Sequence, residues 1–155
     1  MNIEFKHLNE IDPAAIVDLM NNPLVRRQMP LLKTFDLARC TAFVAGKEQL
    51  WRDYGYGPWA FVIDGEFAGW GGLQPEAGEA DLALVLHPNY WGTGMTIYRE
   101  VIKRAFGELG FESVTILFPP TRTRVKAILR LGFKVDGEVE VGGERFIRYR
   151  LLAAP

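Results

Sequence analysis

Residues 87–106 read HPNYWGTGMTIYREVIKRAF and decide the predicted fold, because the hydrophobic period changes inside this stretch. Before it the chain alternates with a period of two, and after Gly94 apolar residues recur every three to four positions. The apolar face of the resulting helix consists of Tyr98, Val101, Ile102, Ala105, Phe106 and Leu109. We therefore predict a strand, a glycine-containing loop and an amphipathic helix that Gly110 ends.

The same signals predict the elements on either side of this stretch. Those upstream are a strand at 2–8, helices at 12–25 and about 34–51, a hairpin at 59–73 turning at Asp64-Gly65, and a third strand at 79–88. Those downstream are a strand at 113–118, a helix at 123–132, and strands at 133–141 and 144–152. This order predicts an α/β fold with a mixed α+β sheet: an N-terminal strand and helices, an antiparallel meander, a crossover helix, then strand, helix and two strands.

Composition limits the number of domains and the class of partner. A chain of 155 residues with 48% hydrophobic content suits a single domain over 1–155. Its formal net charge of -1 argues against nucleic acid as a partner. Residues 121–150 carry eight Lys/Arg against four Asp/Glu, which is either a solvated surface or a preference for an anionic ligand.

The amino terminus and the single cysteine indicate a compartment. Cys40 cannot form an internal disulfide, and one cysteine with two histidines gives no metal-site spacing, so we expect no metal. The start of the chain lacks the features of a secretion signal, and no apolar run approaches the ~20 residues of a membrane span. We expect a cytoplasmic protein without a membrane partner.

The strand at 79–88 carries two carboxylates. Its alternation places Ala80, Leu82, Leu84 and Leu86 on a core face, and Glu79 and Asp81 on the opposite face. The carboxylates either line a cleft or occupy the exposed start of the strand, and the sequence leaves both readings open.

The loop at 91–95, WGTGM, precedes the long helix, where unpaired N–H groups favour an anion. Gly92 and Gly94 allow a ligand to approach the backbone, although two glycines also suit a tight turn. No Lys-Ser/Thr follows as in a P-loop, and Ile97 stands where a dinucleotide fingerprint has a small residue.

With these segments the chain resembles the GNAT superfamily of N-acetyltransferases, and within it the branch of ribosomal-protein alanine acetyltransferases. FAGWGGLQPE at 67–76, ADLALVLHPNYWGTG at 80–94 and the segment 127–151 are similar to the meander, pyrophosphate loop and closing segment of that branch. The family loop pattern Q/R-x-x-G-x-G/A aligns with N-Y-W-G-T-G at 89–94, where Asn89 replaces Gln or Arg.

The resemblance implies acetyl-CoA as the acyl donor. It implies contacts to CoA from Leu84, Leu86, Asn89, Tyr90, Trp91, Gly92, Thr93, Gly94, Met95, Thr96, Thr121 and Arg124. The pyrophosphate would lie on the loop amides, and the pantetheine arm would bond to the backbone near Leu84 and Leu86. A primary amine, either a protein N-terminus or a small molecule, would attack the thioester directly, in a monomer or a homodimer.

The resemblance also implies a catalytic base, because the attacking ammonium must lose a proton. Asp81 aligns with the strand carboxylate proposed for this role, and Glu79 is the second candidate. Ile128 stands where many members carry a tyrosine acid, and Thr121 and Arg124 replace the branch's alternative Asn-x-x-Ser pair. A non-catalytic acyl-CoA-binding or regulatory domain is therefore the alternative function, and a protein-interaction domain is the third.

Overall fold

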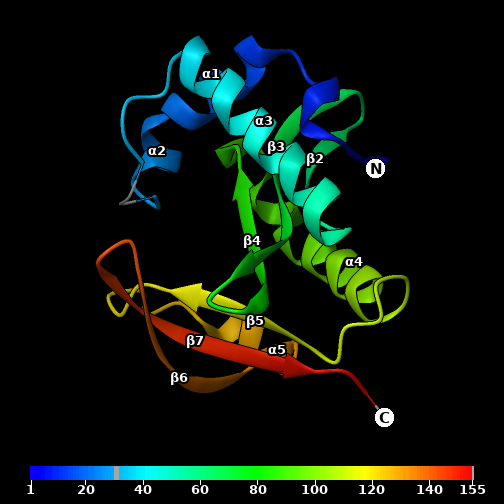
Figure 1. Ribbon diagram of the computed structural model, residues 1–155, viewed down its shortest axis with the longest axis vertical. Helices are drawn as coiled ribbons and strands as arrows, with labels where there is room; N and C mark the ends of the chain where they lie inside the picture. The colour runs from blue at the N-terminus through cyan, green and yellow to red at the C-terminus, as the bar shows by residue number, and fades with distance from the viewer. Residues whose placement is uncertain (30–31, 155) are drawn as a thin grey trace. The chain divides into compact units, whose positions relative to one another are not determined.

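A computed structural model describes residues 1–29 and 32–154 (Figure 1). The elements along the chain are β1 (Ile3–Lys6), η1 (Leu8–Glu10), α1 (Pro13–Asn21), α2 (Pro23–Arg26), α3 (Leu37–Tyr54), β2 (Pro58–Ile63), β3 (Glu66–Glu76), β4 (Glu79–Leu86), η2 (Pro88–Thr93), α4 (Gly94–Phe106), β5 (Ser113–Phe118), α5 (Lys126–Arg130), β6 (Lys134–Val141) and β7 (Glu144–Leu152). Seven strands are hydrogen-bonded in the order β1-β2-β3-β4-β5-β7-β6. The β4–β5 pair is parallel, whereas β1–β2, β2–β3, β5–β7 and β6–β7 are antiparallel. The predicted mixed α/β fold is confirmed.

The chain forms two compact units. The N-terminal unit contains Met1–Gly72 and Leu84–Gly94, and the C-terminal unit contains Leu73–Ala83 and Met95–Pro155. Strands β3 and β4 each contribute residues to both units. The single domain over 1–155 stays a prediction, and the two units are described separately.

The N-terminal unit buries a hydrophobic cluster beneath its helices. The cluster consists of Leu8, Ile16, Leu19, Met20, Val25, Phe35, Cys40, Ala60 and Trp70. Val85 of β4 also packs against it, although its alternation placed it on the face opposite the core. The expected division of β4 into one core face and one open face is therefore wrong at this end of the strand.

Capping residues set the helix boundaries in this unit. The Asp12 carboxylate accepts from the Ala14 amide, and the Asp36 carboxylate accepts from the Arg39 amide. The helix predicted over 12–25 is broken at Asn22, which ends α1 and caps α2. Since Pro23 disfavours helical backbone at the residue before it, this break follows from the sequence.

Gly69 lets β3 approach β4 within the N-terminal unit. Its φ is +158°, and a Cβ at this position would lie 2.1 Å from the Val85 carbonyl oxygen and 2.9 Å from the Leu86 Cα. A side chain cannot fit there, so this glycine is required by close backbone approach.

The C-terminal unit contains α4, α5 and the strands β5, β6 and β7, with β7 between the other two (Figure 1). Its most deeply buried side chains include Leu82, Ile97, Val101, Val114, Ile116 and Phe133. The amphipathic helix predicted after Gly94 is confirmed, but it ends at Phe106, before Gly110. The helix predicted at 123–132 is shorter, because Thr123 and Val125 form a turn before Lys126.

Among the helices of the described residues, none combines the length and the apolar character that a membrane span requires.

Candidate active site

The loop that leads into α4 is itself helical. Residues Pro88–Thr93 form the 3-10 helix η2, and the Asn89 amide donates to Nδ1 of His87. The Gly94 amide donates to the Trp91 carbonyl, and the Tyr90 amide donates to the His87 carbonyl. Some amides predicted to bind an anion are therefore engaged within the loop, which narrows the set available for a phosphate.

Neither loop glycine is required by backbone conformation. Gly92 and Gly94 lack a positive φ, and Gly94 adopts ordinary helical angles of -54° and -44°. A Cβ at Gly92 would meet no atom within 4 Å, and one at Gly94 would meet only Leu86 Cδ1 at 3.9 Å. A tight turn therefore does not explain why glycine stands at these two positions. The space beside the loop is open to an approaching ligand.

Trp91 joins this loop to the end of β4. Its indole Nε1–H donates to the Leu86 carbonyl at 2.9 Å, while the Thr93 hydroxyl donates to the Tyr90 carbonyl at 2.7 Å. The Leu86 carbonyl, predicted to bind the pantetheine arm, is thus already an acceptor within the chain. The prediction for Leu84, a half-buried residue, is unaffected by this contact.

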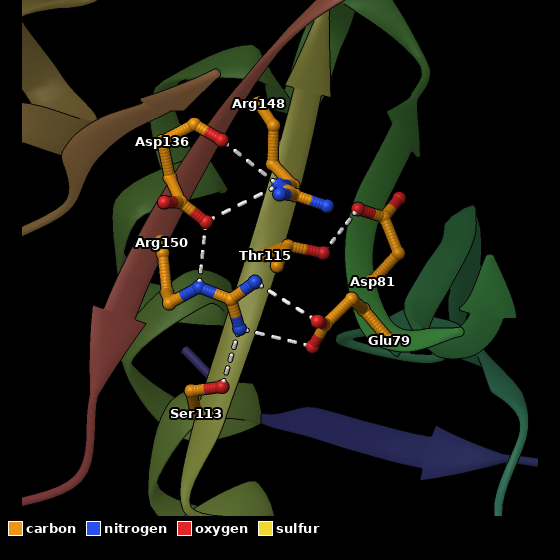
Figure 2. A network of polar contacts seen from close by, with 7 residues as sticks. All are labelled: Glu79, Asp81, Ser113, Thr115, Asp136, Arg148 and Arg150. Atoms are coloured by element: carbon orange, nitrogen blue, oxygen red, sulfur yellow. Dashed lines mark hydrogen bonds and ion pairs between the residues drawn. The ribbon is translucent and has the colours of Figure 1, made fainter. Parts of the chain in front are cut away.

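Asp81 is a buried carboxylate at the point where β4 meets β5. It is 6% exposed and lies in register with Thr115, whose hydroxyl donates to Asp81 Oδ1 at 2.8 Å. No described residue donates a hydrogen bond to Oδ2, the second oxygen of this carboxylate (Figure 2). The exposed-strand-start interpretation of Asp81 is therefore wrong, and one of its oxygens is free to accept a proton.

Burial raises the pKa of Asp81 to about 7. The hydrogen bond from Thr115 favours the charged form and opposes this rise, whereas the nearby charge of Glu76 adds to it. A carboxylate with a pKa near neutrality can accept a proton and release it again at physiological pH.

Glu79 has a different environment, although it lies two residues from Asp81 on the same strand. Its carboxylate forms two 2.9 Å contacts with the guanidinium of Arg150 (Figure 2). These hydrogen bonds lower the pKa of Glu79 despite some desolvation. A carboxylate held in this way is a poor base, and the geometry does not support the predicted catalytic role of Glu79.

Tyr98 on α4 is a further candidate for the active site. The sequence predicts it only as part of the apolar face of this helix. Burial raises the pKa of its hydroxyl, the charge of Arg122 opposes the rise, and the charge of Asp81 adds to it. Tyr98 therefore lies within electrostatic range of Asp81 and stays protonated at neutral pH. A protonated phenol can donate a hydrogen bond or a proton.

Four other residues singled out in the sequence are Thr121, Arg124, Ile128 and Cys40. Thr121 and Arg124 are exposed in the segment between β5 and α5, where Arg122 stacks 3.9 Å from the Phe118 ring centroid. Ile128 is buried in α5, which is consistent with a packing role for this aliphatic side chain. Cys40 is buried and its pKa is raised, which disfavours a reactive thiolate.

The described residues contain no group of three His, Cys, Asp or Glu side chains placed to hold a metal ion.

Comparison with known proteins gives a family match. The family model described as "Acetyltransferase (GNAT) domain" matches residues 2–134. An acetyltransferase from Agrobacterium tumefaciens str. C58 superposes with a TM-score of 0.78 at 18% identity, over 97% of this chain and 91% of that chain.

Two further solved structures share the fold. A candidate ribosomal-protein-serine acetyltransferase from Vibrio cholerae has a TM-score of 0.75 at 14% identity, over 99% of this chain and 95% of that chain. AAC(6')-Ib in complex with paromomycin and acetyl-CoA has a TM-score of 0.78 at 14% identity, over 98% and 94% of the two chains.

Proposed function

The chain belongs to the GNAT acetyltransferase family, and from this premise we propose that it transfers the acetyl group of acetyl-CoA to a primary amine. Asp81 acts as the base that removes a proton from the attacking ammonium. The observation that carries the proposal is this buried carboxylate, with one oxygen bonded to Thr115 and a pKa near 7.

The environment of Asp81 suits the requirement of the reaction. A thioester is already activated, so the main obstacle at neutral pH is that the amine is protonated and cannot attack. A carboxylate with an ordinary pKa near 4 is a weak base for an ammonium. A carboxylate pKa near 7 lies closer to the pKa of the ammonium, so proton transfer between them is less unfavourable. Desolvation of Asp81 therefore increases its strength as a base.

The donor is proposed to bind at the loop between β4 and α4. Open space beside Gly92 and Gly94 supports phosphate approach, and the loop stands immediately before the helix N-terminus. Gly92, Thr93, Met95 and Thr96 remain proposed contacts, with Asn89, Tyr90 and Trp91 holding the loop through the bonds described above.

The proposed reaction also needs a proton donor for the leaving CoA thiolate. The ammonium gives one proton to Asp81, and the neutral nitrogen forms a bond to the acetyl carbon. That nitrogen then loses a second proton to solvent, and the bond from the acetyl carbon to sulfur breaks. The departing CoA thiolate takes a proton, for which we propose the hydroxyl of Tyr98, reprotonated from solvent. The net products are the acetylated amine, CoA thiol and one proton.

The acceptor is an amine of one of two kinds. The Vibrio cholerae structure is that of a candidate ribosomal-protein-serine acetyltransferase, which supports a protein acceptor, such as an N-terminus. AAC(6')-Ib was solved with paromomycin, which supports a small amine. Both acceptors require the same proton removal, so the proposed role of Asp81 holds for either.

A non-catalytic acyl-CoA-binding domain is the second candidate. The observation that favours it is Ile128, a buried aliphatic side chain at the position where many family members carry the tyrosine acid. Tyr98 supplies a hydroxyl from another element, so we favour the enzyme.

Calorimetric titration with acetyl-CoA, followed by thiol release against amines and N-terminal peptides, separates these functions. Binding with turnover supports the acetyltransferase. Binding without turnover across both acceptor classes supports the non-catalytic domain, and the absence of binding contradicts both.

A further inference from the structure

Arg150 of β7 contacts side chains from three other strands (Figure 2). Its two terminal nitrogens lie 2.9 Å from the two carboxylate oxygens of Glu79 on β4, and Nη1 also donates to the Ser113 hydroxyl at 2.8 Å. Its Nε donates to Asp136 of β6 at 2.8 Å. Such a bidentate pair between a guanidinium and a carboxylate fixes the orientation of both side chains as well as bringing their charges together. The Arg150 side chain is only 22% exposed.

Arg150 is also adjacent to the proposed base through the sheet register. Thr115 of β5 pairs with Arg150 on one side and with Asp81 on the other. Directly paired residues point to the same face of a sheet, as do residues two apart on one strand. Glu79, Asp81, Thr115 and Arg150 therefore share one face.

Few backbone contacts hold β4 to β5 here. Within the described residues of the C-terminal unit, Asp81 and Thr115 are the one register pair between these strands. The contact between Glu79 and Arg150, supported by Ser113, adds a second connection two residues away along β4. This side-chain contact therefore supplements the single register pair at Asp81.

We propose that Arg150 is a positioning residue for Asp81: it fixes β4 beside β5 and neutralises the second carboxylate on the same face. The proposal rests on the function proposed above, in which Asp81 is the base. Arg150 itself contacts no reacting group.

The charges around Asp81 make this role measurable. The charged or titratable groups on the elements around Asp81 are Glu79 on its own strand, Glu76 on β3, Tyr98 on α4, Arg122 after β5, Asp136 on β6, and Arg148 and Arg150 on β7. Arg148 already pairs with Asp136 at 3.2 Å. Loss of Arg150 would leave Glu79 as an unpaired negative charge near Asp81. Loss of Glu79 would leave Arg150 paired with Asp136 and would remove one negative charge from the neighbourhood of Asp81.

Carbon-13 NMR of labelled aspartate carboxyls, with the Asp81 signal assigned by its absence in D81N, follows this titration without any need for turnover. We would compare R150M, R150K, E79Q and R150M/E79Q with wild type. R145M is the matched control, because Arg145 on the same strand pairs with Glu138 at 3.7 Å but is 64% exposed.

We expect R150M to raise the titration midpoint of Asp81 by roughly half a pH unit, because a like charge disfavours ionisation. E79Q should lower the midpoint, and R150M/E79Q should return it close to the wild-type value. R150K keeps the positive charge but loses the bidentate contact with Glu79. The titration midpoint of Asp81 should therefore stay nearly unchanged, while kcat should fall roughly tenfold with a similar KM for acetyl-CoA. R145M should change none of these quantities.

An unchanged Asp81 midpoint in both R150M and E79Q, with only thermal stability reduced, would show that Arg150 is merely structural and overturn the proposal. If R150M does not fold, E79Q and R150K decide the question by the same criteria. Failure of the proposed function would be seen separately, as wild-type protein that titrates as expected but turns over no amine.

Discussion

The hydroxyl of Thr115 donates a 2.8 Å hydrogen bond to Oδ1 of Asp81, across the single register pair that joins β4 to β5 in the described C-terminal unit. Burial raises the pKa of this carboxyl, and the Thr115 hydroxyl opposes the rise because it stabilises the charged form. The proposed base is thus both desolvated and held in place by its neighbour.

Thr115→Val removes this hydrogen bond with little change in shape. We expect the pKa of Asp81 to rise above about 7, so the acid limb of the kcat/KM profile should move to higher pH by roughly 0.5–1 unit. The measurement is thiol release between pH 5.5 and 9. An acid limb that stays in place would show that Thr115 does not tune Asp81.

Asp81→Asn should change the pH dependence of stability in a defined direction. The folded pKa is raised from 3.8 to about 7, so the stability advantage of the protonated carboxyl is complete below about pH 4 and is lost as pH rises through 7. Asn carries no such charge. We expect the free energy of unfolding of D81N, relative to wild type, to increase by roughly 2–4 kcal/mol between pH 4 and pH 8.

Urea unfolding of both proteins at matched pH values measures this difference. Groups other than Asp81 contribute to both curves and largely cancel. Parallel curves from pH 4 to pH 8 would contradict the raised pKa.

Gly92→Val tests the loop. Because a Cβ at Gly92 meets no atom within 4 Å and φ is not positive, we expect the free energy of unfolding to change by less than about 1 kcal/mol. The new side chain would occupy the space proposed for phosphate and weaken acetyl-CoA binding at least roughly tenfold. Gly46→Val, in α3, is the control, since a Cβ there also meets no atom within 4 Å. Equal affinity of the two variants in calorimetry would argue against the loop as the donor site.

Tyr98→Phe removes the proposed donor to the CoA thiolate and retains the ring. We expect kcat to fall at least roughly tenfold with acetyl-CoA affinity within about twofold, because general acid catalysis contributes 10²–10⁴-fold where it operates. The decrease should be smaller with an acyl donor whose thiol has a lower pKa. A uniform decrease across donors would assign Tyr98 to packing instead.

The fold was largely predictable because its decisive signals are local. The change of period at Gly94, the Asp64-Gly65 turn and the alternation of the β4 strand each depend on a few neighbouring residues. The errors were also local: Asn22-Pro23 interrupts a predicted helix. They concern boundaries and leave the strand order unaffected.

The candidate site was predictable only in part. Asp81 could be selected from the alternation and the family resemblance, but its buried state depends on elements distant in sequence. Glu79 shares the face of Asp81 in the sequence pattern, but its partner Arg150 is 71 residues away along the chain, so no local pattern predicts their contact. The alternation of Ser113 with Thr115, and of Arg148 with Arg150, was the available signal of a polar sheet face.

The role of Asp81 as the base in acetyl transfer to an amine can be tested directly. The most direct test is the pH dependence of thiol release from acetyl-CoA by wild type and D81N, measured with whichever amine or N-terminal peptide reacts fastest. We predict a wild-type rate that rises with a midpoint near pH 7, and a D81N rate at least roughly 100-fold lower at neutral pH that follows only the pKa of the amine. Equal rates and equal pH profiles for the two proteins would contradict the claim.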